Sequence, residues 1–460
     1  MARSAWPPVR SAWSTAAAIR SGELAAVDAV SVALDRIGRL DPGINAFTVV
    51  TAEAALAQAA EVDGGTRSGP LAGVPISVKD HVWVRGLPAT NGSRALAGFV
   101  APADCACVAR LVAAGAIIVG KTNNPEFCYR GVTRNDLWGE TRNPRDPGRT
   151  CGGSSGGAAA SVASGMVPLA IGTDGGGSIR IPSAFCGTVG LKPTFGLVPK
   201  MPGFRGWPTL SVTGPIAADV RDLALAASVM TGPSPQDPLS YPSGFSVLEE
   251  SGWAGLRVAF SADLGFAALD ADVRAVFAAA INRIGAACAA AGAVLTSAHP
   301  PPCDPSPLWD PIALAEGWAS EGPILEAHPD LVGADAAAII RDGQRISARE
   351  YLDAQDARAR YTTAWLSFFD DYDVLLTPAM PVRAFELGRL APPTINGVAV
   401  PDTYDAWCAL ALPANLAGLP AVSVPIGSGL CSGLPVGLQI IGARWADATV
   451  LRAAAAAADL

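Results

Sequence analysis

Residues 151–183 read CGGSSGGAAASVASGMVPLAIGTDGGGSIRIPS. Two serines stand among glycines in this stretch, Ser154 in GGSSGG and Ser178 in DGGGSIR. An Ala-rich segment and a short apolar run separate them. Glycine is used where the backbone must turn sharply or come close to a ligand. Two such loops, each carrying a hydroxyl, indicate a nucleophile site.

A serine hydroxyl is a weak nucleophile until a base accepts its proton. Histidine is the usual base, and the chain has only His81, His299 and His328. A lysine can do the same work when burial or a cationic neighbour lowers its pKa and leaves it neutral. Lys79 lies in GVPISVKDHV, an apolar run typical of a strand, where a charged side chain is otherwise out of place. It is therefore the best candidate for the base.

Glycine-rich loops have other uses. GGSSGG alone is compatible with a flexible loop. Glycine loops also bind phosphate, but the motif GxxxxGK[ST] is absent and no lysine follows the glycines, so a nucleotide site is not expected. His81 would share a face with Lys79 on a strand, and we expect it to be a packed histidine rather than a participant. No group of residues has metal-ligand spacing, and no metal or cofactor is expected.

The composition favours a globular protein that acts on small molecules. The chain has 460 residues, of which 50% are hydrophobic and 16% charged, enough for a large core. A net charge of −8 and a pI near 5.0 provide no basic surface for nucleic acid or an anionic membrane. Nine cysteines without a CxxC pair indicate free thiols and a cytoplasmic location. Neither a signal peptide nor a membrane span is expected.

The hydrophobic pattern predicts alternating helices and strands. Apolar residues recur at helical spacing from Glu23 to Leu40, and Asp41-Pro42-Gly43 is expected to end that helix. Short apolar runs between Gly and Pro predict buried strands. This alternation predicts a mostly parallel sheet covered by helices. Helices are expected at 51–62, 104–114, 156–164 with Ser155 as N-cap, 270–291 and the C-terminal end, and strands at 74–78, 116–120, 168–172, 256–260 and 373–377.

Several ordered motifs carry a family resemblance. GGSSGGAAASVASG and GTDGGGSIRIPSAFCGTVGLKPTFG, preceded by PLAGVPISVKD, closely resemble the amidase signature family of serine hydrolases. The resemblance resumes at DVLLTPAMP, PANLAGLPAVSVP and GLPVGLQIIG, and residues 300–345 match no pattern. It implies an α/β/α fold on a large, twisted, mixed and mostly parallel sheet. The expected organisation is one domain over 1–460, with N-terminal helices in 1–65, a signature core in 71–200, a variable insert region in 230–372, and completion of the sheet by 373–460.

The same resemblance implies a catalytic triad. Ser178 would be the nucleophile, Ser154, following a cis peptide bond, the bridging serine, and Lys79 the base. Neutral Lys79 would accept a proton relayed through Ser154 while Ser178 attacks a carbonyl carbon, and the leaving nitrogen would be protonated by the reverse route. Water would then hydrolyse the acyl-enzyme.

The residues around the nucleophile also have implied roles. The developing oxyanion needs backbone N–H donors that are fixed in advance. The expected donors are Gly175, Gly176, Gly177 and Ser178. Family members usually carry a side chain where Gly175 stands, so three consecutive glycines need neighbours that hold them. Asp174 and Arg180 would form a salt bridge that supports the loop.

The substrate contacts come from family position and from aromatic residues. The segment EFCYRG, residues 126–131, would face the acyl pocket. Aromatic residues near a site favour an apolar or aryl substrate. The candidates for substrate binding are Phe127, Cys128, Tyr129, Gly153 and Trp207, with Trp138 as a further possibility.

The resemblance implies a hydrolase that cleaves the C–N bond of small apolar or aryl amides. A carbamate presents the same carbonyl, so urethane cleavage stays open. One alternative is the glutaminase subunit of a tRNA-dependent amidotransferase, although RISAREYLDAQDARARYTTAW, from Arg345, does not resemble the corresponding subunit segment. Another is a catalytically silent binding protein on the same fold. The expected partner is a small amide or carbamate, without nucleic acid or membrane, and the chain is expected to be a monomer or homodimer.

Overall fold

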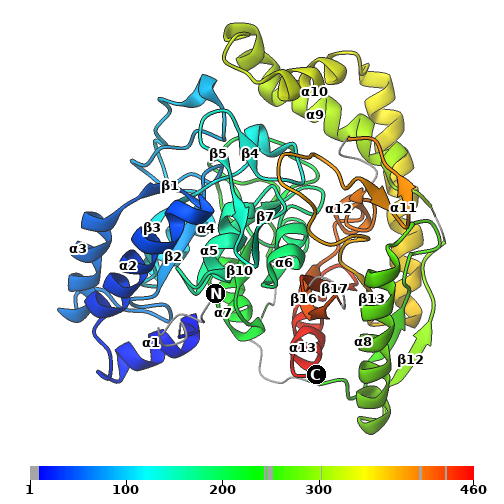
Figure 1. Cartoon of the computed structure of the whole chain (residues 1–460), viewed down its shortest axis with the longest axis horizontal. Helices are drawn as coiled ribbons and strands as arrows, with labels where there is room; N and C mark the ends of the chain where they lie inside the picture. Colours follow the sequence, from blue (N-terminus) through cyan, green and yellow to red (C-terminus); the bar gives the residue numbers. More distant parts are fainter. Residues whose placement is uncertain (1–9, 243–244, 246–251, 302, 403–406, 430–432) are drawn as a thin grey trace.

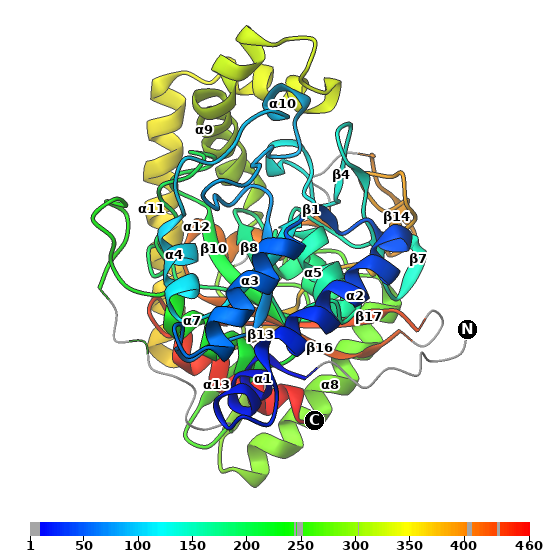
Figure 2. The same cartoon turned by 90° about the vertical axis from the view of Figure 1, so that its left-hand side faces the viewer.

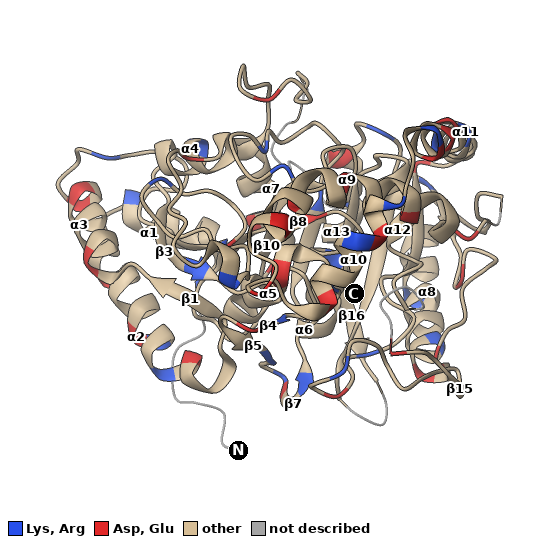
Figure 3. Cartoon of the chain, turned by 90° about the horizontal axis from the view of Figure 1, so that it is seen from above, with Lys and Arg blue, Asp and Glu red and all other residues tan. Residues whose placement is uncertain are grey.

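An 11-stranded mixed sheet forms the centre of the molecule, and helices cover both of its faces (Figure 1, Figure 3). The structure is a computed structural model that describes residues 10–242, 245, 252–301, 303–402, 407–429 and 433–460. The strand order is β1-β3-β2-β8-β10-β9-β16-β17-β13-β11-β12. The strands are β1 Phe47–Val50, β2 Pro75–Lys79, β3 Ile117–Thr122, β8 Leu169–Asp174, β9 Val189–Lys192, β10 Val212–Ala217, β11 Arg257–Phe260, β12 Val294–Ser297, β13 Val374–Pro378, β16 Ala421–Ser428 and β17 Pro435–Gly442.

The mixed α/β fold is confirmed, but the expectation of a mostly parallel sheet is wrong. Parallel pairs occur in two separate groups, β3-β2-β8 and β13-β11-β12. The strands between β8 and β13, and the pair β1-β3, are antiparallel. The parallel groups contain the apolar runs that the sequence reveals. The antiparallel centre contains strands with internal Gly and Pro, such as VTGPIA in β10, which do not have a strand pattern.

The helices form layers against the sheet. α5 and α6 contact each other and the central strands, whereas α7 and α13 contact each other and pack on β9, β10, β16 and β17. Outer helices such as α2, α3 and α11 carry charged residues (Figure 3). The helices are α1 Ala12–Arg20, α2 Ala26–Ile44, α3 Ala52–Asp63, α4 Ala106–Ala113, α5 Gly156–Ala163, α6 Arg180–Cys186, α7 Val220–Met230, α8 Ala271–Ala290, α9 Ser306–Ala327, α10 Ala334–Gln344, α11 Ala348–Asp371, α12 Leu412–Leu416 and α13 Asp447–Ala458.

Short elements complete the chain. Each of three two-stranded sheets joins neighbouring segments outside the central sheet. They are β4 Arg134–Asn135 with β5 Gly139–Glu140, β6 Arg142–Asn143 with β7 Asp146–Thr150, and β14 Thr394–Ile395 with β15 Val398–Ala399. The two 3-10 helices are η1 Arg94–Leu96 and η2 Glu126–Cys128.

One predicted helix end is wrong. Asp41-Pro42-Gly43 was expected to stop the second helix, but α2 continues to Ile44. Ile44 is buried in the core cluster under α2 and α3, and this packing outweighs the local turn signal. The helix ends instead at Asn45, which takes the left-handed conformation with φ 60° and donates its N–H to the Asp41 carbonyl at 2.7 Å.

Helix α8 combines length and low polarity. By length and composition it passes the test for a membrane span, alone among the helices that the structure describes. One face of α8 is buried, with Val273 and Phe277 inside, and it packs on β12, β13, β16 and β17. A helix that packs on a sheet in this way passes the same composition test, so the finding is weak evidence for a membrane.

Within residues 300–345, which match no pattern, residues 306–327 form α9 and residues 334–344 form α10. α9, α10 and most of α11 lie together above one end of the sheet, and we call these three the insert helices (Figure 1, Figure 2). α9 and α10 pack closely on each other, and α11 packs on α9. Ser347 and Glu350 form a capping box at the start of α11, a signal that is visible in the sequence as S-x-x-E.

Candidate active site

Lys79 is the last residue of β2, and it meets the end of the neighbouring strand β8. Because the two strands are parallel, their carboxyl ends lie at the same edge of the sheet. The Lys79 Nζ donates to Ser154 Oγ at 2.7 Å, Ser155 Oγ at 3.1 Å and Thr173 Oγ1 at 2.8 Å. These three hydroxyl groups hold the terminal nitrogen of Lys79 in one position.

Burial lowers the pKa of Lys79 below its ordinary value of 10.5, although Cys128, Asp174 and Asp80 oppose the shift. The side chain is fully buried. Desolvation disfavours the charged form, so Lys79 is closer to neutrality than a surface lysine. A lysine in this state can accept a proton.

Ser155 lies at the N-cap position of α5, as predicted, but its side chain does not cap the helix. Its Oγ instead accepts from Lys79 and donates to the Thr173 carbonyl oxygen at 3.0 Å. The hydroxyl thus holds Lys79 and β8 together. Both Ser155 and Thr173 were missed as site residues, although Thr173 directly precedes Asp174 in the quoted motif.

Ser154 and Ser178 line one small cavity of about 30 Å³, which we call the serine pocket. The Ser155 N–H donates to the Ser178 carbonyl oxygen at 3.1 Å, which ties the two serine loops together. The Gly153–Ser154 peptide bond is cis. The Ser178 hydroxyl makes no hydrogen bond to another described residue. The serine pocket is lined by His81, Phe127, Cys128, Tyr129, Ser154, Thr173, Gly175, Ser178, Gly206, Trp207 and Ser211.

Asp174 and Arg180 form a fully buried ion pair beside Ser178, with Arg180 Nη2 at 2.9 Å from Asp174 Oδ1. Burial alone would raise the pKa of Asp174, but the Arg180 guanidinium holds it well below its ordinary value. Asn415 and Gln439 accept two further guanidinium N–H groups. Both lie in the motifs where the resemblance resumes, PANLAGLP and GLPVGLQIIG. The pair fixes the loop that carries the nucleophile.

The glycine loop departs from prediction at one donor. The Gly177 N–H donates to Asp174 Oδ1 at 2.8 Å, so it is not free for an oxyanion. The predicted role of Gly177 is therefore wrong in this structure. Gly175, Gly176 and Ser178 stay as the candidate donors.

Large neighbours crowd Gly175 and Gly176. A Cβ at Gly175 would lie 2.5 Å from Trp207 Cε3, and one at Gly176 would lie 3.2 Å from Trp309 Cζ2. The Trp309 indole N–H also donates to the Gly175 carbonyl oxygen at 3.3 Å. The indole of Trp207 thus fills the space that a side chain at position 175 would take.

The predicted substrate residues separate into two groups. Phe127, Cys128, Tyr129 and Trp207 line the serine pocket. Phe127 and Cys128 both have positive φ, 52° and 64°, a strained conformation for residues with side chains. Gly153 leaves no room for a side chain, because a Cβ there would lie 2.7 Å from the Val132 backbone.

Trp138 does not line the pocket. Its indole N–H donates to Thr90 Oγ1 at 3.0 Å, so its role is structural. Among the thiols, Cys128 faces Lys79 and Ser154, and burial raises its pKa, so it stays protonated.

His81 follows the end of β2, so it does not share a strand face with Lys79 as the sequence suggested. Its Nδ1 lies 3.0 Å from Asn91 Oδ1, and its ring contacts Phe204 at a centroid distance of 5.6 Å. Burial and the nearby Lys79 lower the pKa of His81 to about 4. It is therefore a neutral, packed side chain at the rim of the pocket.

The four lysines of the chain all lie inside the fold. Lys121 and Lys192 are fully buried like Lys79, and burial lowers their pKa values to about 8 and about 7. The ammonium of the half-buried Lys200 is surrounded by the carbonyl oxygens of Pro208 and Ser211, at 3.0 and 2.9 Å.

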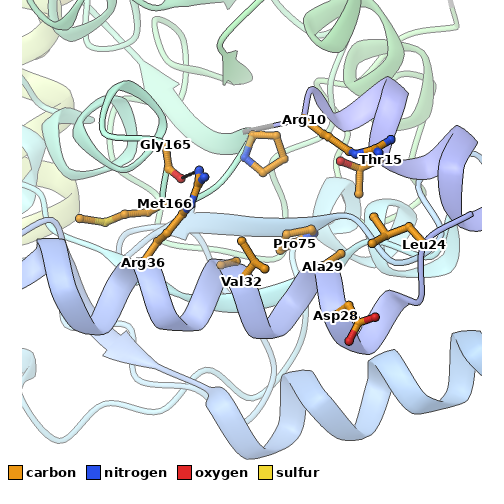
Figure 4. A pocket seen from close by; sticks show the side chains of 12 residues that line it. Arg10, Thr15, Leu24, Asp28, Ala29, Val32, Arg36, Pro75, Gly165 and Met166 are labelled. Carbon is orange, nitrogen blue, oxygen red and sulfur yellow. Dashed lines mark hydrogen bonds between the residues drawn. The ribbon is translucent and has the colours of Figure 1, made fainter. Parts of the chain in front are cut away.

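A larger cavity lies at the other end of β2. It has a volume of about 260 Å³ and is lined mainly by apolar atoms of α1, α2 and the segment after α5 (Figure 4). Pro75, the first residue of β2, borders this cavity, whereas Lys79, the last residue of β2, borders the serine site. A strand of this length places Pro75 and Lys79 about 13 Å apart. The hydroxyl group in the lining of this cavity belongs to Thr15. None of the residues that line the cavity is a lysine or histidine that could act as a base. Size alone therefore does not mark the reactive cavity.

Comparisons with known proteins agree over almost the whole chain. Residues 28–451 match the family described as Amidase. An acylamidase from Rhodococcus erythropolis is 38% identical over 97% of this chain and 94% of its own. A glutamyl-tRNA(Gln) amidotransferase subunit from Symbiobacterium thermophilum is 36% identical over 94% of this chain and 93% of its own. The crystal structure of a bacterial aryl acylamidase of the amidase signature enzymes superposes with a TM-score of 0.89, at 30% identity, over 98% of this chain and 96% of its own.

Proposed function

The chain belongs to the amidase signature family, and from this premise we propose that it hydrolyses small apolar or aryl amides through a Ser178 acyl-enzyme. Membership establishes an amidase enzyme. The substrate class, the roles of Lys79 and Ser154, and activity on carbamates belong to the proposal.

One observation carries the mechanism. The fully buried Lys79 donates to Ser154 Oγ at 2.7 Å, and Ser154 shares the serine pocket with Ser178. The proton path thus begins at the Ser178 hydroxyl, which has no hydrogen-bond partner among the described residues. It continues through the Ser154 hydroxyl to Lys79, whose pKa is lowered. This arrangement is what an activated serine requires.

The reaction uses the three groups in turn. Neutral Lys79 accepts the proton of the Ser154 hydroxyl, and Ser154 accepts the proton of the Ser178 hydroxyl. At the same time, Ser178 Oγ forms a bond to the amide carbon. The N–H groups of Gly175, Gly176 and Ser178 stabilise the oxyanion. The carbon–nitrogen bond then breaks, and the amine leaves with the proton returned from Lys79 through Ser154. Water attacks the resulting ester by the same proton route and releases the acid.

The walls of the serine pocket favour an apolar substrate. None of the described residues that line it is Asp, Glu, Lys or Arg, and His81 is neutral. Phe127, Tyr129 and Trp207 supply aromatic surface. An aryl carbamate has the same carbonyl and a similar leaving amine, so we expect it to react at the same serine.

The amidotransferase relatives present a second candidate, because one of them is 36% identical to this chain. Free glutamine carries an α-ammonium and an α-carboxylate, and each costs several kcal/mol to bury without a partner. The lining of the serine pocket offers no charged partner to either group. This contrast favours the stand-alone hydrolase. Membership of the amidase family counts against a catalytically silent protein on the same fold, and the same experiment tests it.

The test is amine release from an anilide, a short aliphatic amide, an aryl carbamate and free glutamine. We expect release from the anilide and the carbamate and none from glutamine. Ser178→Ala should reduce the rate by several orders of magnitude, because it removes the covalent nucleophile. Release from glutamine alone would support the amidotransferase function. A Ser178→Ala protein that keeps most of its activity would refute the assigned nucleophile, and a wild-type protein that releases no amine would support the silent protein.

A further inference from the structure

Gly175 lies so close to the Trp207 indole that a side chain at position 175 would overlap the ring. An added Cβ at Gly175 would lie 2.5 Å from Cε3 and 3.0 Å from Cζ3 of the Trp207 indole. A real Cβ does not approach another heavy atom this closely, so the indole can lie here only because residue 175 has no side chain. Gly175 and Trp207 both border the serine pocket that contains Ser178.

Two other aromatic rings hold the indole. Tyr129 stacks on Trp207 with a centroid distance of 5.7 Å and an interplanar angle of 27°, and Trp309 of α9 meets it edge-on at 5.0 Å and 83°. The Tyr129 hydroxyl donates to Glu321 of α9 at 2.7 Å. We call Tyr129, Trp207 and Trp309 the aromatic wall. The wall is fixed on one side by the core and on the other by α9.

The loop that carries Trp207 is also tied down. Lys200 Nζ donates to the carbonyl oxygens of Pro208 and Ser211, and Ser320 of α9 donates to the Gly206 carbonyl oxygen at 2.6 Å. Thr209 donates its hydroxyl to the Glu316 carboxyl group of α9 at 2.5 Å. Contacts on both sides of Trp207 therefore keep the indole in place over the nucleophile.

The volume that remains is small. A cavity of about 10–15 Å³ holds one water-sized group. The serine pocket, at about 30 Å³, thus accommodates two or three heavy atoms without movement of its walls. The leaving nitrogen must lie toward Ser154, which returns its proton, so the acyl substituent is the group that approaches Gly175 and Trp207.

We propose that Trp207 is the specificity-determining residue of this site and restricts it to amides with a short acyl group, of acetyl or propionyl size. The inference rests on the proposed function and specifies its substrate class. The buried indole N–H of Trp207 makes no hydrogen bond to another described residue, and a polar atom of a bound acyl group would satisfy it.

The experiment measures kcat/KM for acetyl, butyryl and hexanoyl anilides with wild type and Trp207→Ala. Wild type should prefer acetyl over hexanoyl by at least about 100-fold, because hexanoyl adds four methylenes and even two that the pocket cannot hold should cost about 10-fold each. Trp207→Ala should reduce this ratio at least 10-fold. The control is Trp445→Ala, which removes an exposed tryptophan and should leave the ratio unchanged. A second series with constant acetyl and varied amine should respond little to Trp207→Ala.

A second pair of variants tests the shared space. Gly175→Ala alone should lose activity toward all three anilides, because its methyl group displaces the indole. Adding Trp207→Ala should restore part of that loss, and additive effects of the two substitutions would contradict the exchange. Restoration also shows that the double variant folds.

Failure of the inference and failure of the proposed function are distinguishable. If wild type hydrolyses the anilides but Trp207→Ala keeps the same chain-length order, or changes only the amine preference, the inference is wrong and the hydrolase stands. If wild type hydrolyses none, the proposed function fails, and calorimetric binding of the same anilides to Ser178→Ala decides the inference. The acetyl anilide should bind to Ser178→Ala, whereas the hexanoyl anilide should bind only to the double variant Ser178→Ala with Trp207→Ala. Equal binding of the hexanoyl anilide to the two variants would overturn the inference.

Discussion

The signature core, residues 71–200, and the insert helices α9, α10 and α11 contribute to one pocket in different ways. The core supplies the candidate reacting groups Lys79, Ser154 and Ser178 from strand ends and glycine loops. The insert helices supply Trp309, which packs on Trp207, and Glu321, which accepts from Tyr129; neither lines the pocket itself. In our proposal, the core therefore determines which bond reacts, and the insert helices affect substrate selectivity through their contacts with Trp207 and Tyr129.

This division explains why the sequence of the core predicts its structure and role, whereas the sequence of the insert helices does not. The chemistry of an activated serine limits the residues that can stand beside it, and those limits leave motifs. A supporting helix needs only to place a large side chain at the correct point, which many sequences can do. Substitutions in the two regions should therefore separate rate from selectivity.

The largest effect is expected for Lys79→Met, which keeps the volume of the buried side chain and removes the base. The rate of amide hydrolysis should fall by about 10²–10⁴-fold, the usual contribution of a general base. Single-turnover kinetics measure the loss, and thermal unfolding checks the fold. If Lys79→Met kept most of the hydrolysis rate, Lys79 would not be the catalytic base.

Asp174→Asn tests whether the core also depends on the buried ion pair. Arg180 would keep its charge without its partner, and breaking a buried pair costs about 3–5 kcal/mol in the free energy of unfolding. Urea denaturation at pH 7 measures the loss. Because the pKa of Asp174 is lowered in the fold, the pair stabilises above the ordinary value of 3.8, and this contribution is lost as the pH falls through the lowered native pKa.

Glu386→Gln is the matched control, since Glu386 pairs with Arg149 at 2.7 Å on the surface. It should cost less than about 1 kcal/mol. Equal losses from the two substitutions would show that burial does not distinguish the core pair.

The pH dependence should follow Lys79. Its pKa is lowered by burial, so the neutral base becomes available as the pH rises toward that pKa, below 10.5. The acylation rate should rise about tenfold per pH unit below the pKa and level off above it. Stopped-flow measurement with an activated anilide follows this step, and a rate independent of pH across the neutral and alkaline range would contradict a lysine base.

The smallest effect is expected in the insert helices. Ser320→Ala removes the hydrogen bond from α9 to the Gly206 carbonyl oxygen and should loosen the loop of Trp207. We expect KM to rise a few-fold with kcat unchanged, and a stability cost of about 0.5–1.5 kcal/mol. Ser228→Ala is the matched control, because its hydroxyl also bonds to a carbonyl oxygen, that of Leu225 in α7. The insert would gain a direct role in catalysis if Ser320→Ala reduced kcat instead.

The sequence predicts the candidate triad and the parallel strands but not the antiparallel centre. The runs that became β2, β3 and β8 are continuous and apolar, whereas β10 contains Gly214 and Pro215. Pro215 is tolerated because β9 pairs only with Ile216 and Ala217, so no N–H is needed on that side. Such compensation lies in the partner strand and cannot be found in the segment itself.

The same limit applies to the site. Lys79 and the two serines have a local pattern, as does the Asp174–Arg180 pair. Trp309 reaches Trp207, and Glu321 reaches Tyr129, only when α9 packs on the core, so their role depends on contacts between segments far apart in the sequence. The bond from Gly177 to Asp174 is likewise a matter of loop geometry, and the motif alone gave it a different role.

The internal position of all four lysines has a consequence for the outside of the molecule. Its surface cations are arginines, whose charge persists in strongly alkaline solution because guanidinium does not deprotonate in proteins. The positive charge of the surface should therefore persist between about pH 8 and about pH 11. Reagents that couple to amines, such as succinimidyl esters, should find no freely exposed lysine on the folded protein, and rapid labelling of Lys121 or Lys192 would report unfolding.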